Sequence, residues 1–212
     1  MSRGMSRGRG GGAELESALL LPVPAAEAAV GEHRARLDAS ARDGVPAHVT
    51  VLYPFLPPGQ IGPTVLAELS RVFAGVPRFS FTLDRVRWFG DSVVWVGPSD
   101  ESPFRKLTAL AVAAYPSCLP YRGAYEDVVP HLTVGQVDTG RPGAPAELRA
   151  AGEAVRPLLP IRAEASEVTL MAGPPPGRQG WQGAPGHQGP PGAPGAYGPP
   201  GQWRTVASFP LG

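Results

Sequence analysis

Runs of alternating apolar and polar residues predict β-strands along much of the chain. Successive side chains of a strand point to opposite faces, so such a run predicts a strand with one buried face. The predicted strands cover residues 15–23, 47–53, 78–88, 92–96, 130–135, 162–171 and 202–209. In the third strand the alternation slips by one position near Asp84 and Arg85, which predicts a β-bulge. Gly90 and Asp91 predict a hairpin turn before the fourth strand.

Apolar residues three and four positions apart predict four helices between these strands. Proline is favoured at the first position of a helix, and we expect helices to begin near Pro24, Pro63, Pro103 and Pro145. The second helix has a one-sided apolar stripe, formed by Val65, Leu66, Leu69, Val72 and Phe73. The element order is similar in the two halves of the chain. We therefore predict an α+β, duplicated two-lobe fold, in which two antiparallel sheets form a concave cleft with helices packed outside.

One segment has a different pattern. From Gly177 to Gly201 every third residue is glycine, which is the period of a collagen triple helix. A triple helix needs three chains, however, and this segment lies between two predicted strands. We interpret residues 173–201 as an inserted Gly-x-y loop and keep a trimeric scaffold as the alternative. Residues 1–13 are predicted to be a disordered tail, and residues 14–212 a single bilobal domain in a monomeric protein.

Composition and charge narrow the function classes. The formal net charge of the 212-residue chain is +1. This value argues against a histone-like protein that binds polyanions. It is compatible with a small pocket that binds the end of a nucleic acid. The single cysteine, Cys118, excludes an intrachain disulfide and a cysteine-based metal site. No run approaches the roughly 18 apolar residues of a membrane span. We expect a cytoplasmic protein that does not bind membranes.

The tripeptide His-x-Thr occurs twice, and both times it lies in a predicted strand. His48 and Thr50 are separated by Val49, and His131 and Thr133 by Leu132. Each imidazole and hydroxyl therefore share one face of their strand, while the residue between them points into the core. An imidazole has an ordinary pKa of about 6.5 and can take or give a proton near neutral pH. The pair predicts two half-sites that face a common cleft and act on a phosphate, with the threonine hydroxyls bound to phosphate oxygens.

Two His-x-Thr motifs in a duplicated α+β fold resemble the 2H phosphoesterase superfamily, which includes 2′-5′ RNA ligases and RNA 2′,3′-cyclic phosphodiesterases. The resemblance covers about residues 15–171 and 202–212. It implies a metal-independent phosphoesterase without cofactors, which hydrolyses or reversibly ligates 2′,3′-cyclic phosphates or 2′-5′ linkages of RNA or small nucleotides. It also implies that His48 protonates the leaving oxygen and that His131 activates water.

Other residues near the motifs are candidates for holding the substrate. The aromatic rings of Tyr53 and Tyr125 could stack on a base, and Arg122 could pair with a phosphate. The expected partners are RNA ends or cyclic nucleotides. The alternative is a non-catalytic module that binds RNA ends or nucleotides. A metal site on His48 and His131 is disfavoured, because neither motif has a further zinc ligand at close spacing.

Overall fold

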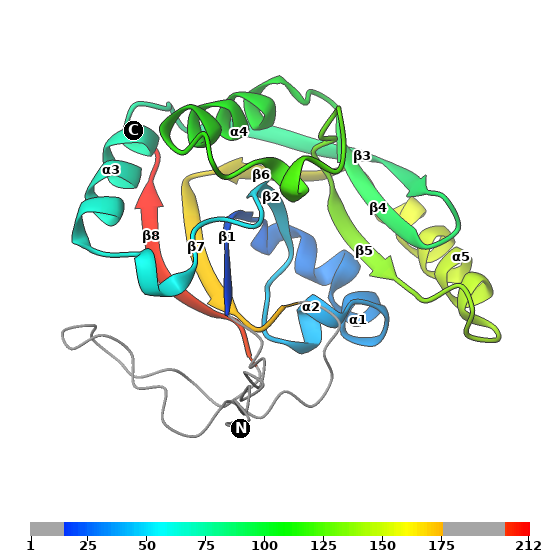
Figure 1. Cartoon of the computed structure of the whole chain (residues 1–212). Helices are drawn as coiled ribbons and strands as arrows, with labels where there is room; N and C mark the ends of the chain where they lie inside the picture. The colour runs from blue at the N-terminus through cyan, green and yellow to red at the C-terminus, as the bar shows by residue number, and fades with distance from the viewer. Residues whose placement is uncertain (1–14, 176–201) are drawn as a thin grey trace, which may run out of the picture.

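The computed structural model describes residues 15–175 and 202–212, in which two antiparallel sheets form two lobes (Figure 1). The first sheet has the strand order β2-β1-β7-β8, and the second has the order β5-β4-β3-β6. The strands are β1 (Glu16–Pro22), β2 (His48–Leu52), β3 (Phe79–Phe89), β4 (Val93–Pro98), β5 (Leu132–Gln136), β6 (Ile161–Ala165), β7 (Glu167–Gly173) and β8 (Arg204–Pro210). The predicted α+β fold with two antiparallel sheets is confirmed. The predicted tail and the Gly repeat from residue 177 onward lie outside the described residues.

Helices cover the sheets, and two of them pack across the boundary between the lobes. They are α1 (Glu27–Leu37), α2 (Ala39–Arg42), α3 (Pro63–Ala74), α4 (Ser102–Ala114) and α5 (Ala144–Val155). Helix α1, which precedes β2 in the chain, packs against β5 of the second sheet, and α4, which precedes β5, packs against β2 of the first. The Thr108 hydroxyl of α4 donates to the Val51 carbonyl of β2 at 2.9 Å. Because each of these two helices packs against the sheet of the other lobe, both lobes share one hydrophobic core.

The apolar patterns account for most of these elements. In α3 the predicted stripe faces the core, with Leu69 and Phe73 fully buried. The predicted bulge in β3 is confirmed, because the pairing of β3 with β4 shifts between Leu83 and Arg85. None of the helices in the described part of the chain is long and apolar enough to cross a membrane.

The predicted strand over residues 162–171 is wrong in one respect, because the structure has two strands there. β6 belongs to the second sheet and β7 to the first, and Ser166 lies between them. The alternation changes phase at this point, since Ala163 and Ala165 point inward before the break and Val168 and Leu170 are buried after it. The chain therefore crosses from one lobe to the other at Ser166. As a result the first sheet combines strands from both ends of the chain. The two lobes therefore do not correspond to the two halves of the sequence.

Candidate active site

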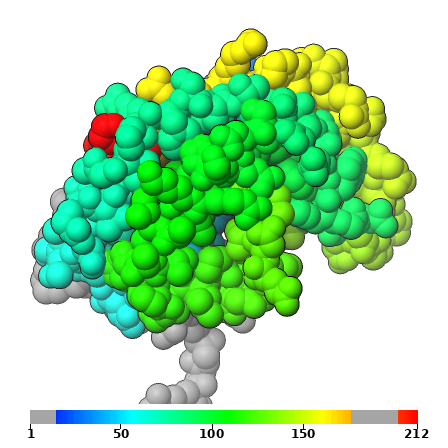
Figure 2. Space-filling view, turned by 90° about the horizontal axis from the view of Figure 1, so that it is seen from above, coloured from blue at the N-terminus to red at the C-terminus, as the bar shows by residue number. Residues whose placement is uncertain are grey.

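The two His-x-Thr motifs lie on neighbouring edges of the two sheets. β2 begins at His48 and is an edge strand of the first sheet. β5 begins one residue after His131 and is an edge strand of the second sheet. These two edge strands contact each other. Val49 and Leu132 are buried in the core, so each histidine and its threonine point to the opposite face of the strand. Figure 2 shows a narrow hollow between the green segments, with blue atoms from the N-terminal part of the chain visible within it.

Both imidazoles make the same hydrogen bond to the backbone. Nδ1 of His48 lies 2.7 Å from the carbonyl oxygen of Pro46, and Nδ1 of His131 lies 2.7 Å from that of Val129. A carbonyl oxygen can only accept, so Nδ1 carries the proton in both rings. In the neutral form the lone pair is then on Nε2, which is the nitrogen left to accept a proton from a ligand or from water. In both half-sites Nε2 is thus the ring nitrogen that is available to a ligand.

The surroundings favour the neutral form of both rings. Burial and then the positive charge of Arg34 lower the pKa of His48 to about 4, and the charge of His131 contributes in the same direction. Burial likewise lowers the pKa of His131. His131 is therefore near enough to affect the pKa of His48. An anion bound between them would raise these pKa values, because it favours the protonated ring.

A turn from the second half of the chain docks on the first half-site. In the turn Pro120–Gly123, the Tyr121 backbone N–H donates to the Tyr53 carbonyl at 2.6 Å, and the Tyr121 hydroxyl lies near enough to the Thr50 side chain for it to lower the pKa of Tyr121, although burial raises that pKa more. Tyr121 and Arg122 have φ values of 49° and 58°, which are unfavourable for residues with a side chain. Such strain persists only where the surroundings fix the backbone, and it is common at binding sites.

The predicted substrate-binding residues gather beside this turn. The Tyr53 hydroxyl donates to one carboxylate oxygen of Glu16, and Arg122 pairs with the other at 2.5 Å. Burial and the bond to Glu16 raise the pKa of Tyr53. Tyr125 is 64% exposed, and its ring lies 5.6 Å from the ring of Tyr121. Arg122 is thus held by a carboxylate, and Tyr125 presents an exposed ring.

Two aromatic residues that the sequence did not single out flank His131. The imidazole lies 5.0 Å from the ring of Phe89 and 5.7 Å from that of Trp95, and these two rings stack on each other at 4.8 Å. Trp95 is paired with Thr133 across β4 and β5, which brings it to the same face. The alternation of residues 92–96 separates Trp95 from the core residues beside it. Only the pairing of β4 with β5, however, brings it to His131.

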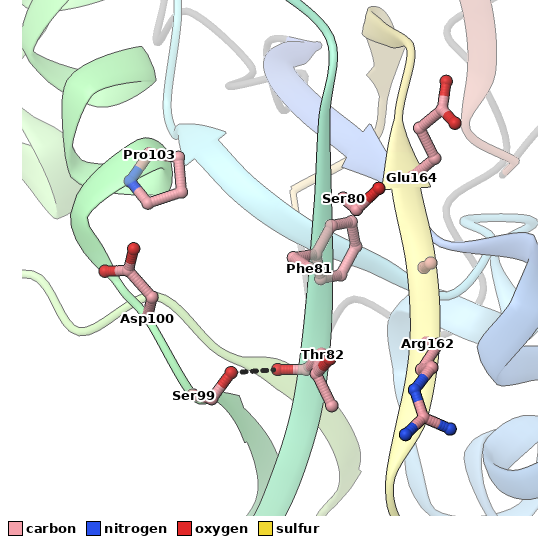
Figure 3. Close-up of a pocket in the computed structure, with 9 residues that line it drawn as sticks. Ser80, Phe81, Thr82, Ser99, Asp100, Pro103, Arg162 and Glu164 are labelled. Carbon is pink, nitrogen blue, oxygen red and sulfur yellow. Dashed lines mark hydrogen bonds between the residues drawn. The ribbon is translucent and has the colours of Figure 1, made fainter.

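Two surface hollows are lined by residues outside the His-x-Thr motifs. One, of about 540 Å³, lies between β3, β6 and the start of α4 and is lined by Thr82, Ser99, Arg162 and their neighbours (Figure 3). The other, of about 410 Å³, is bordered by Phe55, Cys118 and Arg122 among others. No group of three or more histidine, cysteine or acidic side chains that could hold a metal ion occurs within residues 15–175 and 202–212.

Comparison with known proteins relates this arrangement to one family. The sequence model of the 2′-5′ RNA ligase superfamily matches residues 22–173. No curated protein matches the sequence. The structure is similar to that of Escherichia coli LigT complexed with 3′-AMP, at 16% identity and a TM-score of 0.50 over 93% of this chain and 98% of that chain. It is also similar to TT0787 of Thermus thermophilus, at 17% identity and a TM-score of 0.54 over 93% and 97%. A structure described as a phosphoesterase matches at 16% identity with a TM-score of 0.51, over 93% and 98%. At these identities the solved structures establish a shared fold.

Proposed function

Because the chain belongs to the 2′-5′ RNA ligase superfamily of 2H phosphoesterases, we propose that it hydrolyses or reversibly ligates 2′,3′-cyclic phosphates or 2′-5′ linkages of RNA or small nucleotides. Its catalytic residues are His48, Thr50, His131 and Thr133. The observation that carries the proposal is the matched pair of half-sites on contacting edge strands, each with Nδ1 of its imidazole at a carbonyl oxygen.

The chemistry follows from two imidazoles that share one phosphate. One neutral ring takes a proton from water through Nε2 while the water oxygen attacks phosphorus. The P–O bond to one ribose oxygen breaks, and the other ring, protonated in the substrate complex, gives its proton to that oxygen. The product is a phosphomonoester, and the two rings have exchanged their protonation states. Each such proton transfer contributes about 10²–10⁴-fold in rate.

The threonines and the docked turn have separate tasks in this proposal. The hydroxyls of Thr50 and Thr133 donate to the non-bridging phosphate oxygens, where charge increases in the transition state. Tyr53, Arg122 and Tyr125 hold the nucleoside and its neighbouring phosphate. The exposed ring of Tyr125 supports a stacking role, since a base can stack on an open aromatic face.

Nucleotides are the first ligands to test. The related LigT structures contain 3′-AMP and NADP+, which supports a nucleotide or an RNA end as the partner of this cleft. The experiment incubates the protein in EDTA with a panel of nucleoside 2′,3′-cyclic phosphates and with RNA that ends in a 2′,3′-cyclic phosphate. Phosphorus NMR then identifies the product and the position of its phosphate.

We expect turnover by the wild-type protein, and we expect His48→Ala and His131→Ala each to lower kcat/KM by about 10²–10⁴-fold. His33→Ala is the matched control, because His33 lies outside both motifs, on α1, where Nδ1 approaches Nη2 of Arg36 at 3.4 Å. Circular dichroism verifies that each variant is folded. If the wild-type protein binds these ligands but converts none of them, the protein is instead a non-catalytic module that binds nucleotides or RNA ends.

A further inference from the structure

Helix α1 carries a buried arginine directly behind the first half-site. The Arg34 side chain is 2% exposed and donates to the Asp38 carboxylate from Nε at 3.1 Å and from Nη2 at 3.0 Å. Nη2 also donates to the Val45 carbonyl at 3.2 Å. Asp38 in turn accepts from the backbone N–H of Ser40 at 2.9 Å. A buried guanidinium is tolerated only with partners of this kind, so the cluster fixes Arg34 against the segment that leads to His48.

A second residue of α1 holds the same segment. The Glu27 carboxylate accepts from the Ala47 backbone N–H at 2.7 Å, and the Val23 N–H donates to the Ala47 carbonyl at 2.8 Å. Pro46 lies between the two anchored residues, and its carbonyl accepts from Nδ1 of His48. The backbone that orients the imidazole is therefore held on both sides by α1.

Arg34 also acts on His48 through its charge. Among the charged groups that affect the pKa of His48, Arg34 has the largest effect and lowers it. Asp38 raises this pKa by less, and His131 lowers it by less again. Although Arg34 and Asp38 are paired, the cation dominates at the imidazole.

The second half-site has a different arrangement. Arg105 on α4 binds Asp127 at 2.6 Å and Glu101 at 2.8 Å, and thereby holds the loop before His131. This arginine is 41% exposed, however, and the causes that set the pKa of His131 are burial and the bond to the Val129 carbonyl. The two imidazoles are thus alike in their hydrogen bonds but unequal in their surroundings.

On the basis of the proposed function, we propose that Arg34 is a positioning residue for His48, which orients the imidazole through residues 45–47. Asp38 holds the guanidinium in place, and Glu27 completes the support from the same helix. Arg34 does not touch the substrate in this role.

The test combines NMR titration of the histidine rings with steady-state kinetics on a 2′,3′-cyclic nucleotide. Arg34→Gln removes the charge, so we expect the pKa of His48 to rise by about one unit, and the limb of the pH–rate profile that His48 sets to move with it. Arg34→Lys retains the charge but cannot make the forked contacts. We expect it to leave the pKa of His48 low and to lower kcat/KM by about tenfold.

Three further variants complete the test. Glu27→Ala releases Ala47 without removing the cation, and we expect it to lower kcat/KM with a smaller change in the pKa of His48. If Arg34→Gln does not fold, Arg34→Gln/Asp38→Asn removes both buried charges together and is titrated instead. Arg36→Gln is the control, since Arg36 is exposed on the same helix, and it should change neither quantity.

The titration needs no turnover, so it separates this inference from the proposed function. A wild-type protein that is inactive on cyclic nucleotides, but whose His48 pKa rises in Arg34→Gln, contradicts the proposed activity and supports the role of Arg34. Folded Arg34 variants with an unchanged His48 pKa and unchanged kcat/KM would overturn the inference.

Discussion

At the scale of residues, the cleft depends on where each histidine keeps its proton. A carbonyl two positions earlier in the chain holds Nδ1 in both motifs, and burial disfavours a charge on either ring. The ligand-free site therefore carries two neutral imidazoles at neutral pH. A bound phosphate supplies the negative charge that allows one of them to become protonated, so catalysis and anion binding are linked through the same proton.

The low pKa of His48 has a consequence for stability. In the unfolded chain this imidazole has its ordinary pKa of about 6.5, whereas in the folded protein its pKa is about 4. Between these pH values the unfolded state binds a proton that the folded state does not bind. We expect the free energy of unfolding to fall as the pH decreases from 6.5 to 4, by on the order of 2 kcal/mol from this group.

Urea unfolding across this pH range measures the effect. In His48→Gln the same decrease should be smaller by that amount. Equal pH dependence in the wild-type protein and His48→Gln would show that the His48 ring is not kept neutral by the fold.

At the scale of elements, the local pattern explains the strands and helices better than it explains the contacts between them. The alternation around Val49 and Leu132 was enough to predict that each histidine shares a face with its threonine. The same rule identified the bulge after Leu83 but overlooked the break at Ser166, where the phase also slips. Both slips look alike in the sequence, and only pairing with different neighbours makes one a bulge and the other a crossing between sheets.

The rest of the site comes from contacts between distant segments. Phe89 and Trp95 reach His131 through strand pairing, and Tyr121 reaches Thr50 because its turn docks on another lobe. No local period encodes such contacts. The position of Arg34 behind the first half-site could not be predicted from the sequence either. An arginine on a helix is usually solvated, and only the packing of α1 buries this one.

Substitution of Gly135 tests how closely α1 and α5 pack on β5. A methyl group at this position would lie 2.9 Å from Cβ of Leu37 and 3.0 Å from Cδ1 of Leu148, closer than carbon atoms normally approach. We expect Gly135→Ala to lower the free energy of unfolding by about 1–3 kcal/mol, because α1 must shift at Leu37 and the Leu148 side chain must move. Thermal or urea denaturation provides the measurement.

Gly59→Ala is the matched control. A methyl group there has no atom within 4 Å, so we expect a change within about 0.5 kcal/mol. If the two variants were equally stable, the helices would have to pack on β5 more loosely than the structure indicates.

At the scale of the whole molecule, the exchange of helices ties the two lobes together. α1 packs behind the motif strand of the second sheet and α4 behind that of the first, and the core is continuous between the sheets. Neither lobe can lose its structure without exposing apolar surface of the other. We predict that residues 14–212 form a single bilobal domain and that it unfolds in one cooperative step.

Tryptophan fluorescence can follow each lobe separately. Trp203 lies beside the first sheet and Trp95 in the second, so variants that retain only one of these tryptophans report on one lobe each. Their denaturation midpoints should coincide with each other and with the midpoint from far-UV circular dichroism. Two separate midpoints would mean that the lobes are independent folding units.

Helix α1 has a particular place in this arrangement, because it serves both halves of the cleft at once. Its Arg34 lies behind His48, while its Leu37 packs on Gly135, two residues beyond Thr133. Changes in this helix therefore reach both half-sites, at position 34 through His48 and at position 37 through the packing on β5. We expect libraries randomised on its inner face to yield active variants mainly as correlated sets, in which a change at position 34 or 37 is accepted together with compensating changes on β5 or α5.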